Sequence, residues 1–159
     1  VVDEYLAFAR GEWTEAVVSA DVAELLDDVV NGARRNGATI ALAAERGLTV
    51  PLRPNAFKRC ITNIVSNAQR HADRIEISAA RQRDTIEIVV DDDGPGIPAS
   101  DREEVFKPFY RREGSRNQQT GGIGLGLTIA RDIMRGHGGD IVLEDAPQGG
   151  VRARVRLPI

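Results

Sequence analysis

The chain has 159 residues, of which 42% are hydrophobic and 28% charged, so it is long enough for one domain with a real core. Its formal net charge of −3 argues against binding nucleic acid through a basic face. Its one cysteine, Cys60, excludes an intrachain disulfide and indicates a reducing compartment, and its apolar runs are shorter than the roughly 18 residues of a membrane span.

The first third of the chain is expected to contain helices and short strands, because its apolar residues alternate between helical and strand spacing. Asp21 and Glu24, three residues apart, form a capping-box pattern that starts a helix. The expected elements are the end of a helix over residues 1–10 that Gly11 stops, a short strand over 13–19, a helix over 21–35, and strands over 38–43 and 48–52 joined by a turn around Gly47.

The rest of the chain is also expected to contain both helices and strands. Pro54 suits the first turn of a helix. The expected elements are a helix over 54–72, strands over 74–80 and 85–92 with a turn at 83–84, a short helix over 100–105, a loop over 110–122, a helix over 124–135, and strands over 140–144 and 151–157 that form a hairpin around 148–150.

Several neighbouring strands have only short connections, which a parallel sheet does not allow. We therefore predict an α/β fold. It is a two-layer α/β sandwich whose mixed, mainly antiparallel sheet is covered on one face by helices, not a doubly wound parallel sheet.

A polar row lies opposite the apolar stripe of the predicted helix 54–72. Asn63, Asn67 and then Arg70 or His71 follow one another at steps of three or four and share one face. Asparagine is a poor helix former, and its carboxamide oxygen suits Mg²⁺ that keeps most of its waters and phosphates. The alternative is a solvated helix face.

The strand 85–92 ends in a carboxylate. Alternation puts Asp92, rather than Asp91 or Asp93, on the same face as the apolar residues. Such a carboxylate needs hydrogen-bond donors, and an exocyclic amine such as that of adenine supplies one. Gly94 and Gly96 then permit a tight bend. The alternative is a surface Asp-Gly turn.

A glycine-rich run over 121–126 leads into the apolar stretch of the last predicted helix. Unpaired N–H groups and the helix dipole at such a junction favour phosphate, although turn chemistry alone also explains it. Phe106 and Phe109 precede the predicted loop and either pack beneath it as its hinge or serve packing alone. Loop residues Arg111, Arg112 and Arg116 either reach phosphates or stay solvated.

These four segments, in this order, resemble the N, G1, F and G2 boxes of bacterial sensor histidine kinases, which belong to an ATPase superfamily shared with gyrase, the Hsp90 chaperones and MutL. The resemblance covers residues 13–159, as a catalytic ATP-binding domain of the Bergerat fold. Residues 1–12 resemble the C-terminal end of the helix of a dimerisation and phosphoacceptor domain, as in osmosensor-type kinases.

The resemblance implies ATP and Mg²⁺ as cofactors and residues 110–122 as an ATP lid. By motif position, Asp92 would bind the adenine amino group and Asn67 would ligate Mg²⁺. Asn63, Arg70 and His71 are the candidate catalytic residues. The implied nucleotide contacts are Asn63, Asn67, Arg70, His71, Asp92, Gly94, Gly96, Ile97, Phe106, Tyr110, Arg111, Gly122, Ile123, Gly124, Leu125, Gly126 and Leu127.

Superfamily members that hydrolyse ATP carry a glutamate four residues before the metal asparagine, where this chain has Asn63. Because a carboxamide cannot act as a general base, we expect transfer of the γ-phosphoryl group to a histidine instead of hydrolysis. His71 and His137 lack the sequence context of a phosphoacceptor. We therefore expect the acceptor to lie outside this chain, which would not autophosphorylate alone.

The implied partners are the dimerisation and phosphoacceptor domain of a homodimeric parent and, through that parent, a response regulator. The chain itself is expected to be a monomer or a weakly associating cytoplasmic domain of an inner-membrane sensor. Two alternatives remain, namely a serine kinase of the anti-sigma type on the same fold and an ATP-binding module that regulates a partner without catalysis.

Overall fold

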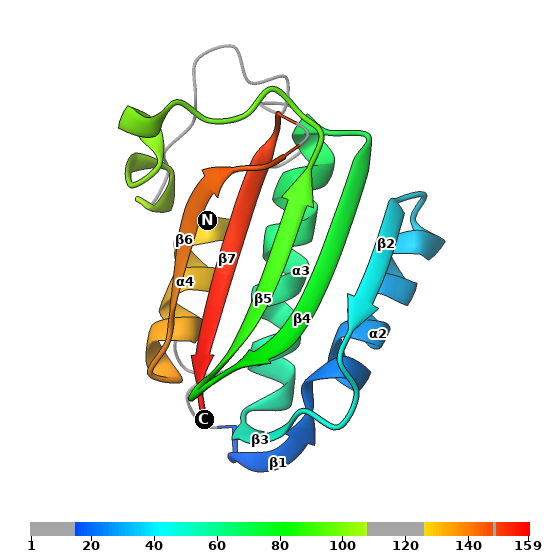
Figure 1. Cartoon of the computed structure of the whole chain (residues 1–159), viewed down its shortest axis with the longest axis vertical. Coiled ribbons are helices and arrows are strands. Elements are labelled where there is room, and N and C mark those ends of the chain that lie inside the picture. Colours follow the sequence, from blue (N-terminus) through cyan, green and yellow to red (C-terminus); the bar gives the residue numbers. More distant parts are fainter. Residues whose placement is uncertain (1–14, 108–125, 148) are drawn as a thin grey trace.

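The computed structural model describes residues 15–107, 126–147 and 149–159. Its helices and strands follow one another in a mixed order (Figure 1). They are β1 (Val18–Asp21), α2 (Val22–Arg35), β2 (Thr39–Ala44), β3 (Thr49–Leu52), α3 (Pro54–His71), β4 (Arg74–Gln82), β5 (Thr85–Asp92), the 3₁₀ turns η1 (Ala99–Asp101) and η2 (Glu104–Phe106), α4 (Gly126–Gly136), β6 (Asp140–Asp145) and β7 (Val151–Pro158).

The main sheet has five strands in the order β2-β4-β5-β7-β6. Only β2 and β4 pair in parallel, and the other neighbours are antiparallel. The helices α2, α3 and α4 lie together behind this sheet, whose other face carries no helix (Figure 1). The predicted two-layer sandwich, with a mixed and mainly antiparallel sheet covered on one face, is therefore confirmed.

The core lies between the sheet and the helices. Alternate residues of β4, β5 and β7 face the helices and are buried. The largest fully buried side chains come from every layer, and among them are Leu26, Phe57, Ile61, Ile77, Ile86, Ile88, Ile129, Ile133, Met134, Ile141 and Leu157. Burial of such side chains is the main stabilising contribution to the fold, at roughly 1.5–3 kcal/mol each.

Several expected elements differ from those observed. The strand expected over 13–19 is β1 at Val18–Asp21, because Asp21 both ends this strand and caps the next helix. The strands expected over 38–43 and 48–52 exist, but β2 pairs with β4 whereas β3 pairs with β1 in a separate two-stranded sheet. The helix expected over 100–105 is two 3₁₀ turns. The helix end predicted over 1–10, the domain fragment 1–12 and the loop 110–122 lie outside the described residues.

Two helices begin with different caps. At α2 the predicted cap is confirmed, since Asp21 Oδ1 accepts a hydrogen bond from Ala23 N at 2.8 Å. At α3 the cap residue, Arg53, makes no side-chain capping bond. Glu15 caps this helix from far away in sequence, because its two carboxylate oxygens accept from Asn55 N at 2.8 Å and Ala56 N at 2.9 Å.

A histidine ties the end of α4 to the start of α3. His137 Nε2 accepts a hydrogen bond from Arg53 N at 3.0 Å, and its Nδ1 lies 2.8 Å from Ile133 O. Because Nε2 accepts and Nδ1 faces a carbonyl, the neutral Nδ1–H tautomer fits this site.

Strand β2 lies at one edge of the main sheet. The Arg34 side chain, from the last turn of α2, donates from Nε and NH2 to the Ile40 carbonyl of this strand, at 3.2 and 2.6 Å. A carbonyl engaged in this way is not available to another strand, so Arg34 protects the edge. No described helix combines the length and the apolar character needed to cross a bilayer.

Candidate functional site

The described residues predicted to form a site come from α3, the end of β5, the loop after it, the 3₁₀ turn η2 and the start of α4. Figure 1 shows the carboxyl ends of α3 and β5 at the same end of the sheet, together with the turn between β6 and β7. Asn63, Asn67, Arg70 and His71 are half-buried on α3. Asn63 Nδ2 donates to the Gly126 carbonyl at 3.2 Å, which joins the polar row of α3 to the first residue of α4.

The Asp92 carboxylate is buried and oriented by the backbone. The residue is only 6% exposed. Oδ1 accepts hydrogen bonds from Gly94 N and from Val151 N, both at 3.0 Å. Neither bond uses the second carboxylate oxygen, Oδ2. A buried carboxylate held by one oxygen is suited to accept a hydrogen bond from a ligand with the other.

The loop after β5 packs closely against α3. A Cβ placed on Gly94 would lie 2.5 Å from the His71 carbonyl oxygen, so this position has no room for a side chain. Gly96 has a φ of +81°, which disfavours other residues. Ile97 packs partly buried against the core. Both predicted loop glycines are thus required, Gly94 by the lack of space and Gly96 by its backbone conformation, which favours a shaped loop over a simple surface turn.

As alternation predicts, Asp92 lies on the same face of β5 as the buried apolar residues. Asp91 points to the opposite, helix-free face, yet it is also only 6% exposed. Arg152 covers it there with two hydrogen bonds of 2.8 Å. Asp93 is exposed, and hydrogen bonds from the backbone of Arg74 and Asp73 lower its pKa.

The predicted aromatic hinge residue Phe106 is tied to α4. Its carbonyl accepts a hydrogen bond from Thr128 Oγ1 at 2.7 Å, and the Arg131 guanidinium carbon lies 4.1 Å from the centre of its ring. Arg131 also donates to both carboxylate oxygens of Glu103, at 2.9 and 3.2 Å, and to Asp140 at 3.0 Å. Burial lowers the Arg131 pKa, but these hydrogen bonds outweigh it and the net shift is upward.

At the start of α4, Gly126 is half-buried and Leu127 is buried. The other predicted contacts of the glycine run and of the loop lie outside the described residues, namely Tyr110, Arg111, Gly122, Ile123, Gly124 and Leu125. Their predicted roles remain predictions.

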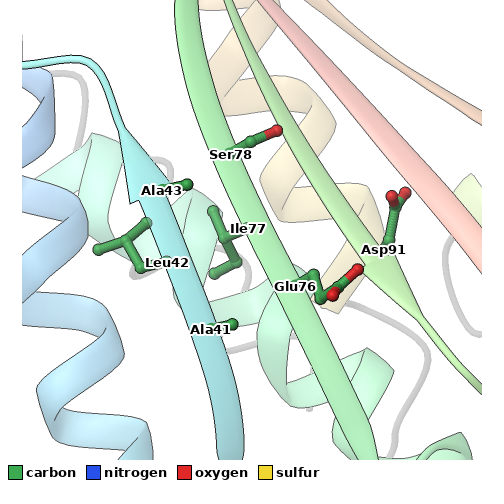
Figure 2. Close-up of a pocket in the computed structure, with 7 residues that line it drawn as sticks. All are labelled: Ala41, Leu42, Ala43, Glu76, Ile77, Ser78 and Asp91. Carbon is green, nitrogen blue, oxygen red and sulfur yellow. The ribbon is translucent and has the colours of Figure 1, made fainter.

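A pocket of about 250 Å³ lies elsewhere and is lined by residues of β2, β4 and β5 (Figure 2). It is lined by Ala41, Leu42, Ala43, Glu76, Ile77, Ser78 and Asp91. Its only aspartate is the one that points away from the helices, so this pocket is separate from the site around Asp92.

Sequence reasoning missed three residues that support the site. Val151 and Gly150 contact Asp92 from the turn that the sequence shows only as the end of a hairpin. Arg131 was missed although it carried a signal, because a charged residue on the apolar stripe of a helix needs partners for its charge.

Comparison with known proteins gives consistent matches. The family model described as histidine kinase-, DNA gyrase B-, and HSP90-like ATPase matches residues 53–159. The chain is 36% identical over its whole length to the sensor histidine kinase CpxA of Escherichia coli, of which it covers 36%. The chain therefore spans about a third of the length of this curated relative.

Solved structures of histidine kinase domains superpose on this chain. The ATP-binding domain of PrrB from Mycobacterium tuberculosis superposes with a TM-score of 0.75 at 28% identity, over 91% of this chain and 98% of that one. The histidine kinase domain of the E. coli osmosensor EnvZ superposes with a TM-score of 0.68 at 32% identity, over 89% and 88% of the two chains.

Proposed function

The chain belongs to the histidine kinase-, DNA gyrase B-, and HSP90-like ATPase family, as its motifs predict, and we propose that it is the catalytic ATP-binding domain of a sensor histidine kinase. In this proposal it binds Mg·ATP and donates the γ-phosphoryl group to a histidine outside these 159 residues. The oxygen between the β- and γ-phosphorus atoms leaves with ADP as the bond from the histidine nitrogen to phosphorus forms.

The observation that carries the proposal is the buried Asp92 carboxylate, held by Gly94 N and Val151 N on one oxygen. A carboxylate accepts hydrogen bonds but donates none, so it matches the 6-amino group of adenine and opposes the 6-oxo group of guanine. An unmatched buried hydrogen bond costs about 1–3 kcal/mol, which is enough to select the base.

The residues on α3 fit a metal that is shared with phosphates. Within the described ranges there is no cluster of three or more His, Cys, Asp or Glu that could hold a metal ion by itself. Mg²⁺ in nucleotide sites is normally held by one or two protein oxygens together with phosphates and waters. In this proposal Asn67 supplies that oxygen, and the bound ion neutralises charge on the phosphates.

Asn63 supports transfer over hydrolysis. Its carboxamide cannot take a proton from water, and its Nδ2 donates to the Gly126 carbonyl. We propose that Asn63 braces the start of α4 on the phosphate side, that Arg70 lies near the phosphates, and that His71 contributes through its place beside the Gly94 loop. The parent would be a homodimeric membrane sensor with a cytoplasmic catalytic domain and a response regulator as partner.

The proposal is tested by calorimetry and by phosphoryl transfer. The chain should bind Mg·ATP, and Asn67→Ala should remove the Mg²⁺-dependent part of the affinity. Asp92→Asn should lower the affinity for ATP by about tenfold or more. With ATP labelled in the γ-phosphate, label should appear on an added domain that carries the acceptor histidine and not stably on this chain. Equal affinity for ATP and GTP would count against Asp92 as the group that reads the base.

Label on an added serine substrate, and none on the histidine, would instead favour a serine kinase. Mg·ATP binding without transfer to either substrate would favour a regulatory module.

A further inference from the structure

The turn between β6 and β7 lies against the side chain that the proposed function assigns to the base. We propose that the backbone at Gly150 and Val151 positions Asp92 and thereby sets the selectivity of the site for a base that carries an exocyclic amine. This inference rests on the proposed function, which requires Asp92 to read the base.

The first contact is a hydrogen bond. Val151 N donates to Asp92 Oδ1 at 3.0 Å across 59 residues of sequence, and Gly94 N donates to the same oxygen at the same distance. Two donors that converge on one carboxylate oxygen fix the rotation of the side chain. The direction in which Oδ2 accepts is therefore set jointly by the loop after β5 and by the start of β7.

The second contact is steric. A Cβ placed on Gly150 would overlap both the backbone oxygen and Oδ1 of Asp92, closer than real Cβ atoms approach other atoms. Gly150 is buried, and its φ lies outside the left-handed region, so it is the lack of space and not the backbone conformation that requires glycine here. Any side chain at this position would push the carboxylate away.

The turn is built to hold this position. Ala146 N donates to the Gly150 carbonyl at 2.9 Å, and Gly149 N donates to the Ala146 carbonyl at 3.0 Å. The loop after β5 also touches the turn, since a Cβ on Gly96 would lie 3.2 Å from the Gly149 carbonyl oxygen.

One step further along β7, on the other face of the sheet, a second pair fixes the two strands. Arg152 is directly opposite Asp91 in the register of β5 and β7, and it holds that carboxylate with two bonds of 2.8 Å. Strand β7 therefore engages two consecutive aspartates of β5. The backbone N–H of Val151 donates to Asp92 on one face, while the Arg152 side chain donates to Asp91 on the other.

The experiment compares two nucleotides that differ only in the amine. ATP carries the 6-amino group, whereas purine riboside triphosphate has hydrogen in its place. Binding of each with Mg²⁺ is measured by calorimetry for the parent chain, Gly150→Ala and Val151→Pro. Proline deletes the N–H that Asp92 accepts and is tolerated at the first residue of a strand. Gly149→Asn is the control for strain in the same turn, because a Cβ there meets open space whereas its φ of +98° is strained even for asparagine.

The parent and Gly149→Asn should prefer ATP by about tenfold, which is the value of one buried hydrogen bond to a charged group. Gly150→Ala and Val151→Pro should reduce this preference to about twofold or less, mainly by lowering the affinity for ATP. A general loss of structure would instead lower the affinities for both nucleotides by the same factor and leave their ratio unchanged. That result would overturn the inference. If Gly150→Ala does not fold, Val151→Pro decides.

A parent that binds both nucleotides equally would refute the assignment of Asp92 as the base-reading group and the inference with it. A parent that prefers ATP, with folded variants that keep the preference, would refute the inference alone.

Discussion

Arg131→Met tests whether the cluster around Phe106 stabilises the protein. The Arg131 side chain is 11% exposed, and methionine keeps the apolar part of its packing while it removes the charge. The change deletes the contact with the Phe106 ring, worth about 0.5–1 kcal/mol. It also deletes the ion pairs with Glu103 and Asp140, whose side chains are 71% and 43% exposed, so that each pair is worth only about 0.5 kcal/mol.

The two carboxylates left behind are exposed enough for water to solvate them, so no buried charge is orphaned. Methionine also avoids the cost of burying a guanidinium. Together these effects predict a net loss of about 1 kcal/mol in the free energy of unfolding at pH 7. Urea denaturation followed by circular dichroism measures it.

The pH dependence of this stability difference tests the ion pair between Arg131 and Asp140. Burial raises the Asp140 pKa, but hydrogen bonds from Arg131, from the backbone of Ile141 and from Arg135 outweigh it, and the net shift is downward. A lowered folded-state pKa contributes stability that is present above the unfolded value and is lost as pH falls through the folded value. The stability difference between the parent and Arg131→Met should therefore narrow between about pH 5 and pH 3.

Arg135→Met is the matched control, because Arg135 contacts the same Asp140 from a side chain that is 55% exposed. It should cost no more than about 0.5 kcal/mol. The reasoning fails if Arg131→Met is as stable as the parent at pH 7. It also fails if the stability difference stays constant down to pH 3.

Two further substitutions test contacts between distant segments, and one labelling experiment tests the burial of Cys60. Glu15→Ala should lower stability by about 1 kcal/mol, measured by urea denaturation, because it uncaps α3; an unchanged midpoint would refute the cap. His137→Phe should cost about 1–3 kcal/mol in the same assay, because the Arg53 N–H loses its acceptor, and full stability would show that this bond contributes nothing. Burial raises the pKa of the Cys60 thiol, so iodoacetamide should modify it only after denaturation, and rapid labelling of the native chain would contradict the buried position.

Much of the fold could be predicted because its strands and long helices are strongly periodic. The expected helix 54–72 and strand 85–92 agree with α3 and β5 to within a residue. The short segment over 100–105 is too brief for a helical period, and its 3₁₀ turns are held by contacts from outside it, such as Arg131 to Glu103. Likewise the partner of each of the strands expected over 38–43 and 48–52 depends on which distant strand is available, and the spacing of apolar residues does not encode this.

In the candidate site, too, residues with a local signal could be predicted, whereas residues that depend on distant contacts could not. Asp92, Gly94 and Gly96 could be recognised because each carries a local signal, namely a charge that ends an apolar row or a glycine beside it. Gly150 could not, since its requirement for glycine comes from Asp92, which is 58 positions away and becomes a neighbour only when β5 and β7 pair. The burial of Asp91 also lacks a local signal, because the side chain that covers it comes from Arg152 on β7.

The remote cap of α3 also has a mechanical consequence. Glu15 holds the chain at the amino end of α3, whereas the Gly94 loop and Asp92 lie at its carboxyl end, beside His71. A helix of 18 residues is about 27 Å long, so the Glu15 cap and the Gly94 loop lie about that far apart. If α3 tilted about its amino end, where Glu15 caps it, a tilt of about 20° would displace its carboxyl end by about 9 Å.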